Sequence, residues 1–344
     1  MSRWLSLVLI LFANWAHSAD YVIAISVDAL GSQYLQALIQ ADQLPHFKQL
    51  EMEAAYTLNA RTDFDITVTL PNHTSMITSR PILGPVGHHW VKNTDPAADM
   101  TLHSNRGAYV AGVFDVAHDH SLRTGLWATK TKFSLFRISY DAGHGAPDMT
   151  GENNGPNKLD VVVYELASPA LTRNFITTMS TQPCQASLIH FAEPDSAGHT
   201  SGWGNEAYNN ALITIDTCLG QIMDLIATNS LLKGKTTLIV TADHGGKGRN
   251  HNDADEPLNY TIPFLVWGAG VTPGDLYDWN TGVRQNPGTN HPAYTDPLQP
   301  IRNSEVGNLM LSLLNLGPIP GSAINTRQDL RITRSTPADP VQAH

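Results

Sequence analysis

YVIAISVDAL, residues 21–30, is an apolar run rich in β-branched side chains that ends close to the carboxylate of Asp28. Short runs of this kind are typical of strands buried on both faces of a parallel sheet. Similar runs recur along the chain with amphipathic stretches between them, which predicts a doubly wound α/β fold with a mostly parallel sheet. The predicted strands are residues 21–30, 108–114, 159–166, 186–195, 236–246 and 260–268.

Two helices are predicted from side-chain periodicity. Residues 205–229 carry a helically spaced apolar stripe that should face the core. Residues 304–315 form the second helix, with Ser304 as its N-cap. The stripe consists of Leu212, Ile215, Leu219, Ile222, Met223 and Ile226.

Three of the predicted strands end in an acid, at Asp28, Asp195 and Asp243. The carboxyl ends of the strands in an open parallel sheet line one crevice, where ligands bind. Three carboxylates that meet there would repel one another unless a cation neutralised them. The pattern therefore predicts a cation site at this edge of the sheet.

Histidines accompany these acids. His199 follows Asp195 by four residues, His244 is adjacent to Asp243, and His251 follows a few residues later. Imidazole and carboxylate ligands together favour zinc or a similar metal over calcium or magnesium.

The stretch VTLPNHTSMITS, residues 68–79, suggests a helix with Pro71 in its first turn, where the missing N–H is no loss. Thr69 would then lie at the helix entrance, where free backbone N–H groups attract an anion. By itself the stretch fits either a helix cap or a nucleophile aimed at a phosphate.

The composition limits the class of ligand. The chain has 344 residues and a formal net charge of −10, which argues against a nucleic-acid polymer as partner. A small anionic substrate remains compatible with this charge where a local cation is present. The oligomeric state is left open.

Residues 1–18 have an early Arg3, an apolar stretch and small residues near Ser18, the pattern of a secretory signal peptide. We expect cleavage near Ser18, a secreted or periplasmic protein, and no stable membrane anchor, because no later segment reads as a membrane span. In an oxidising compartment Cys184 and Cys218 could form one disulfide, but two free thiols fit the sequence nearly as well.

The segments TLPNHT, EPDSAGH, TADHGG and HND, in this order, resemble the alkaline phosphatase superfamily, most closely its type I phosphodiesterase/nucleotide pyrophosphatase family. The resemblance runs from about residue 21 to IRNSEVGNLMLSLLNLGPIPGS near the C-terminus. It implies an alkaline-phosphatase-like core with helices on both faces of the sheet, and residues 19–344 as a single catalytic domain.

The resemblance also implies the site residues. Thr69 would be the nucleophile and form a covalent phospho-threonine, and Asn72 would donate its amide to a phosphoryl oxygen. His291 competes for the place of His251, which is preferred because it precedes the strand at 260–268. Two Zn²⁺ ions would be held by Asp28, Asp243 and His244 beside Thr69 (site one) and by Asp195, His199 and His251 (site two).

Leu70 occupies the position where the monoesterases of the superfamily carry an arginine, so the resemblance favours a diester or pyrophosphate substrate, with nucleotides among the candidates. The alternatives are a phosphonate hydrolase of the phosphonoacetate type, a phosphomonoesterase, and an inactive exported binding protein. His118, His120 and His144 have no acid at ligand spacing and are interpreted as packing or surface residues.

Overall fold

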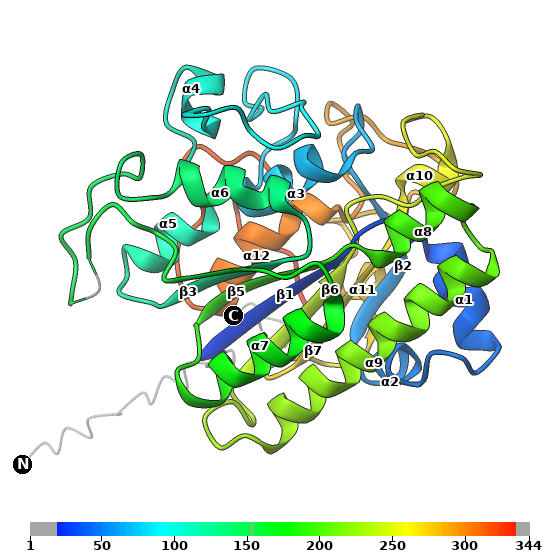
Figure 1. The fold of residues 1–344 in the computed structure, drawn as a ribbon. Coiled ribbons are helices and arrows are strands. Elements are labelled where there is room, and N and C mark those ends of the chain that lie inside the picture. The colour runs from blue at the N-terminus through cyan, green and yellow to red at the C-terminus, as the bar shows by residue number, and fades with distance from the viewer. Residues whose placement is uncertain (1–18, 153, 335–344) are drawn as a thin grey trace, which may run out of the picture.

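The computed structural model describes residues 19–152 and 154–334 (Figure 1). The predicted signal peptide, residues 1–18, lies outside the described residues. One eight-stranded sheet runs through the described part of the chain, in the order β4-β3-β5-β1-β6-β7-β2-β8. Its strands are β1 (Tyr21–Val27), β2 (Ala55–Arg61), β3 (Thr124–Ala128), β4 (Val161–Tyr164), β5 (Ala186–Phe191), β6 (Thr236–Thr241), β7 (Thr261–Gly268) and β8 (Gly274–Asp275).

The sheet is mostly parallel, as predicted. β4, β3, β5, β1 and β6 pair in parallel, whereas β7 is antiparallel to both of its neighbours. β1 is the central strand, and its register pairs Val27 with Phe191 of β5 and Ser26 with Thr241 of β6. The carboxyl ends of β1, β5 and β6 therefore lie at the same edge of the sheet, as predicted from the acids that follow these strands.

Helices cover both faces of the sheet: α2, α7 and α9 lie on one face, and α3, α5 and α12 on the other (Figure 1). The described residues also form 3₁₀ turns at 131–133 and 303–305. The helices are α1 (Ser32–Gln40), α2 (Pro45–Glu53), α3 (Thr69–Thr78), α4 (Leu102–Arg106), α5 (Val113–His118), α6 (Ser134–Ser139), α7 (Ser168–Thr181), α8 (Glu193–Ser201), α9 (Glu206–Thr228), α10 (Pro257–Tyr260), α11 (Leu276–Trp279) and α12 (Val306–Leu313).

The predicted helix at 205–229 is confirmed as α9, and its six-residue apolar stripe is buried. Asn205 caps it, since the Asn205 side chain accepts a hydrogen bond from the Tyr208 N–H at 3.0 Å. With a mean hydropathy of 1.4, α9 is long and apolar enough to cross a membrane by length and composition alone. The expectation that no segment after the leader would pass this test was wrong.

The strand predicted at 108–114 is wrong. The Gly112 N–H donates to Asp115 Oδ2 at 2.7 Å, and this contact starts α5 at Val113. The strand beside β5 is instead β3, whose sequence TGLWA contains no isoleucine or valine and so escaped the search for β-branched runs. β2 was also missed.

The helix predicted at 304–315 begins two residues later, as α12. Ser304 lies inside the 3₁₀ turn that precedes α12 and makes no capping hydrogen bond, so the predicted cap is wrong. Cys184 and Cys218 are buried free thiols.

Candidate active site

Three acids meet at the carboxyl edge of the sheet, as their strand-end positions predict. Asp28 directly follows β1, Asp243 lies two residues beyond β6, and Asp195 is the third residue of α8, which follows β5. All three are buried, with at most 5% of their surface exposed. The buried carboxylates gather around two groups of candidate metal ligands.

The first group contains Asp28, Asp243 and His244, whose ligand atoms lie within 4.8 Å of one another. His244 Nε2 is 3.3 Å from Asp243 Oδ2 and 3.5 Å from Asp28 Oδ1. Thr69 is the first residue of α3, and its Oγ1 lies 3.5 Å from His244 Nε2. The hydroxyl is thus next to the first group, at a helix N-terminus.

The second group contains Asp195, His199 and His251. His199 Nε2 lies 3.3 Å from Asp195 Oδ1 and 3.1 Å from His251 Nε2. The structure brings His251 to this group rather than its competitor His291, whose ring stacks on Tyr260 at 4.0 Å between centroids.

Each of the three histidines has its Nδ1 against a backbone carbonyl. The acceptors are the carbonyl oxygens of Arg249 for His199, of Gly245 for His244 and of Thr67 for His251, at 3.1, 2.8 and 2.6 Å. A carbonyl can only accept, so Nδ1 carries the hydrogen, and a neutral ring keeps its lone pair on Nε2. Such bonds orient metal-ligating imidazoles. All three Nε2 atoms are therefore directed as metal ligands.

The three carboxylates also have atoms that are free to bind a metal. Asp28 Oδ1, Asp195 Oδ1 and Asp243 Oδ2 are buried and have no hydrogen-bond partner in the described part of the chain. Buried polar atoms are normally paired, because an unsatisfied one costs about 1–3 kcal/mol. Three acids and three imidazoles with free lone pairs fit two zinc-type ions in donor number and chemistry.

Burial and neighbouring charges shift the pKa values of all three residues in the first group. Burial opposes ionisation of Asp28, but Lys130 and nearby histidines outweigh it and hold its pKa well below the usual value. Burial and the charge of Asp28 raise the pKa of Asp243 well above its usual value. Burial and His251 lower the pKa of His244 to about 3, so this imidazole is neutral at ordinary pH.

Lys130 is a site residue that the sequence analysis missed. Its Nζ lies 2.6 Å from Asp28 Oδ2 and 2.6 Å from Asp195 Oδ2, and so bridges one acid of each group. Lys130 follows the carboxyl end of β3 by two residues, and β3 pairs with β5. Recognising β3 as a strand would have placed this lysine at the site.

Asn72 does not have the contacts predicted for it. Its Nδ2 donates to the carbonyls of Ile66 and Val68 at 2.8 and 3.0 Å, so both amide hydrogens are engaged. Its side chain fixes the turn that leads into α3, and is not free to donate to a substrate. Asn93 is another candidate donor: its Oδ1 accepts from the Leu70 N–H at 3.0 Å, and its Nδ2 has no partner among the described residues.

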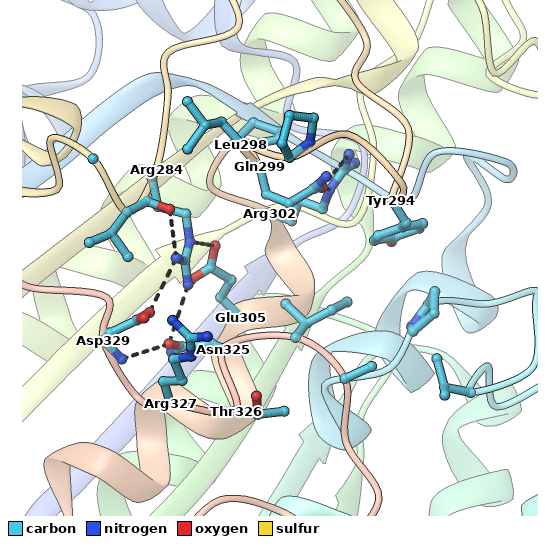
Figure 2. A pocket seen from close by; sticks show the side chains of 18 residues that line it. Arg284, Tyr294, Leu298, Gln299, Arg302, Glu305, Asn325, Thr326, Arg327 and Asp329 are labelled. Atoms are coloured by element: carbon cyan, nitrogen blue, oxygen red, sulfur yellow. Dashed lines mark hydrogen bonds and ion pairs between the residues drawn. The ribbon is translucent and has the colours of Figure 1, made fainter.

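A separate cavity of about 450 Å³ (Figure 2) is lined by none of the eight predicted site residues. Arg284, Arg302, Glu305 and Asp329 line it together with prolines and aliphatic side chains. Its wall contacts the turn that leads into α3, because the Tyr294 hydroxyl donates to Asp63 Oδ2 at 2.8 Å.

The sequence profile of the type I phosphodiesterase/nucleotide pyrophosphatase family matches residues 22–264, which is most of the chain. The chain belongs to this family. Bis(5'-adenosyl)-triphosphatase enpp4 of Xenopus laevis is 27% identical to it over 262 residues, which cover 71% of this chain and 52% of that protein. The chain spans 21–52% of the length of the curated relatives that it matches.

Two solved structures share the fold. Murine ectonucleotide pyrophosphatase/phosphodiesterase 5, an inactive variant in complex with AMP, matches with a TM-score of 0.58 and 14% identity over 90% of this chain and 99% of that one. An alkaline phosphatase superfamily protein from Vibrio parahaemolyticus matches with a TM-score of 0.57 and 15% identity over 90% and 70%. These likenesses show an alkaline-phosphatase-like fold.

Proposed function

We propose that the chain is a metal-dependent hydrolase of phosphate diesters or pyrophosphates, with Thr69 as its nucleophile. The observation that carries this proposal is the position of Thr69 Oγ1, 3.5 Å from His244 Nε2, beside buried carboxylate oxygens that lack partners. Membership of the type I phosphodiesterase/nucleotide pyrophosphatase family supports it.

Under this proposal one zinc ion is held by Asp28, Asp243 and His244 beside Thr69, and a second by Asp195, His199 and His251. Bound zinc would supply Lewis acidity, which makes a hydroxyl a better nucleophile and stabilises the charge on the oxygens of an in-line displacement. The carbonyl contacts at Nδ1 orient the three imidazoles, and the buried amide of Asn72 holds the turn that positions Thr69.

The proposed reaction has two steps on Thr69. In the first, Oγ1 loses its proton to solvent and bonds to phosphorus, while the P–O bond to the leaving group breaks and the leaving oxygen keeps the electron pair. In the second, water adds its oxygen to phosphorus, the Oγ1–P bond breaks, and Oγ1 regains a proton. The covalent phospho-threonine divides one displacement into two.

A nucleotide is the proposed substrate class. The murine relative was solved with AMP, and the Xenopus relative is named a bis(5'-adenosyl)-triphosphatase. Leu70 is buried in this chain, so no cation follows the nucleophile directly to bind a doubly charged monoester. Phe64 is partly exposed five residues before Thr69 and offers a ring on which a base could stack.

A second candidate is a phosphonate hydrolase, favoured by the lysine pair at the site. Lys130 bridges Asp28 and Asp195, and Lys132 Nζ lies 3.1 Å from Asn93 Oδ1. Two ammonium groups beside the nucleophile would suit a substrate that carries a second anionic group, such as a carboxylate next to phosphorus.

The test compares bis(p-nitrophenyl) phosphate, p-nitrophenyl phosphate and phosphonoacetate as substrates of the zinc-loaded protein and of Thr69→Ala. We expect diester turnover that exceeds monoester turnover and falls by about 10³-fold or more in the variant. Thr78→Ala, a buried threonine on the same helix, is the matched control and should keep its activity.

The outcomes separate the candidates. Preference for the monoester, or a Thr69→Ala variant as active as the parent, would overturn the proposal. Release of inorganic phosphate from phosphonoacetate, followed by ³¹P NMR, would favour the second candidate. If the protein binds zinc but turns over none of these substrates, the alternative of an inactive exported binding protein would be favoured.

We further propose that the protein is exported to the periplasm or the medium, on the basis of the leader-like composition of residues 1–18. N-terminal sequencing of protein recovered from each cell fraction tests this. An exported product that begins near Ala19 is expected, and an intact N-terminus on protein confined to the cytoplasm would contradict it.

A further inference from the structure

A third group of possible metal ligands lies outside the active site, at the C-terminal end of α5. His118 is the last residue of α5, Asp119 follows it, and Asp148 belongs to the long segment after α6. One ligand atom from each of the three lies within 4.8 Å of the other two. Sequence spacing did not indicate this group, because the partner of His118 is 30 residues away.

Two of the three residues are buried with unpaired ligand atoms. His118 is 1% and Asp148 is 7% exposed, and neither His118 Nδ1 nor Asp148 Oδ2 makes a hydrogen bond in the described part of the chain. The two atoms lie 3.3 Å apart. A ring nitrogen and a carboxylate oxygen that face each other at this distance without a hydrogen bond leave both lone pairs available to a cation.

The third residue completes the geometry of a cation site. Asp119 is partly exposed, with 38% of its side chain accessible, and so provides a route to solvent and room for water ligands. Lys158 Nζ contacts its Oδ1 at 2.6 Å, which leaves Oδ2 for a further ligand. Two carboxylates and one ammonium give this group a net negative charge when His118 is neutral.

We propose that His118, Asp119 and Asp148 bind a third divalent metal ion of the zinc class, separate from the active site. One imidazole and two carboxylates are a ligand set that zinc accepts, with solvent in the fourth position. The ion would cross-link the end of α5 to the segment at 141–158.

The protein contacts around the group agree with a structural role. Asp148 Oδ1 accepts from the Thr150 N–H at 2.8 Å, and the Ser121 hydroxyl donates to the Thr150 carbonyl at 3.2 Å. Lys158 Nζ also donates to the Gly155 carbonyl at 3.1 Å. The segment that follows α6 is thus already tied to the end of α5 (Figure 1), and the metal would make this connection resistant to opening.

The test is zinc content by elemental analysis, after dialysis of the full chain against Zn²⁺ and removal of the excess. His118→Ala and Asp148→Asn should each hold about one zinc ion fewer per chain than the parent and keep diesterase activity. His120→Ala is the matched control, since His120 is an exposed neighbour with its Nδ1 on the Val116 carbonyl. Zinc should also slow proteolysis within 141–158 in the parent and in His120→Ala, but not in Asp148→Asn.

Equal zinc content in the parent and in Asp148→Asn would overturn the proposal and leave an ion pair between His118 and Asp148. Circular dichroism identifies a variant that fails to fold. If His118→Ala fails to fold, the nearly isosteric Asp148→Asn is used alone to test the proposal. The result does not depend on the proposed function, because failure of the active-site metal assignment would appear as an unchanged zinc content in Asp243→Asn.

Discussion

The active-site edge of the sheet and the cavity of Figure 2 both contain buried carboxylates, but these are neutralised in different ways. Beside the cavity, Glu305 accepts two hydrogen bonds from Arg284 at 2.8 and 3.1 Å, and Asp329 Oδ1 lies 3.2 Å from the same guanidinium. At the strand ends, each of the three acids keeps one oxygen without a partner. Carboxylates that are paired internally need no further cation, whereas converging unpaired oxygens are typical of a cation-binding site.

The pKa shifts of Arg284 beside the cavity and Asp243 at the active-site edge reflect the same difference in pairing. Burial opposes the charge of Arg284, but Glu305 and Asp329 outweigh it, and the pKa of Arg284 is raised above its ordinary value. Asp243 has burial and the charge of Asp28 acting in the same direction, so its pKa is raised and it favours the neutral acid. Removing a charge at the active-site edge should therefore reduce activity more than stability, whereas removing one beside the cavity should reduce stability more than activity.

Asp243→Asn should have the largest effect on activity and a small effect on folding. Diesterase activity should fall by at least about 100-fold, since even residues that only support metal ligands cost 10–100-fold. The amide oxygen can keep the bonds that Oδ1 accepts from the N–H groups of Ala29 and His244, so the stability of the metal-free protein should be equal or higher. A diesterase assay and thermal melts in a chelator measure the two effects, with the exposed Asp224→Asn as control. A large loss of metal-free stability would contradict the comparison.

Glu305→Gln should have the reverse effect. It removes the charge that pairs with Arg284, and breaking a buried ion pair costs about 3–5 kcal/mol of unfolding free energy. Activity per folded molecule should stay that of the parent, because Glu305 lies outside the candidate site. Urea denaturation provides the measurement, with the exposed Glu206→Gln as control, and a cost near zero would show that the pair does not stabilise the fold.

Lys130→Met should destabilise the metal-free protein more than the zinc-loaded one. Lys130 is the cation that Asp28 and Asp195 share in the structure, and charged hydrogen bonds contribute about 1.5–3 kcal/mol each. Bound zinc would take over this neutralisation. Melting temperatures with chelator and with zinc test the difference, and Lys132→Met is the neighbouring control. Equal losses in both conditions would exclude this role.

The smallest expected effect is the pH dependence of zinc affinity. The pKa of Asp243 is raised, chiefly by burial, and that of His199 is raised by the adjacent Asp195 carboxylate, so protons compete with zinc at these two ligands up to a higher pH than at ordinary groups. His244, with a pKa of about 3, holds none at neutral pH. Affinity should therefore rise with pH through the ordinary histidine range, by about tenfold per pH unit for each proton released. Titration calorimetry in buffers of different ionisation enthalpy counts these protons, and a flat profile would contradict the assignment.

Much of the site was predictable because its signals are local. The apolar runs that form β1, β5 and β6 are continuous in sequence, and the acid at the C-terminal end of each run can be recognised without a structure. The four-residue spacing of Asp195 and His199 is one helical turn, and α8 places both in the second group. For the same reason α9 was found from its apolar stripe, whereas β3, with no isoleucine or valine, was not.

The sequence by itself identified the candidate site residues: buried strands end in acids, histidines accompany them, and a threonine begins a helix. Only the tertiary structure decided which of their atoms remain unpaired. The register of β1 with β5 and β6 aligns the strand ends, β3 brings Lys130 between Asp28 and Asp195, and the turn before α3 engages the amide of Asn72. These contacts join segments far apart in the chain, and they depend on strand pairing and burial that no local pattern encodes.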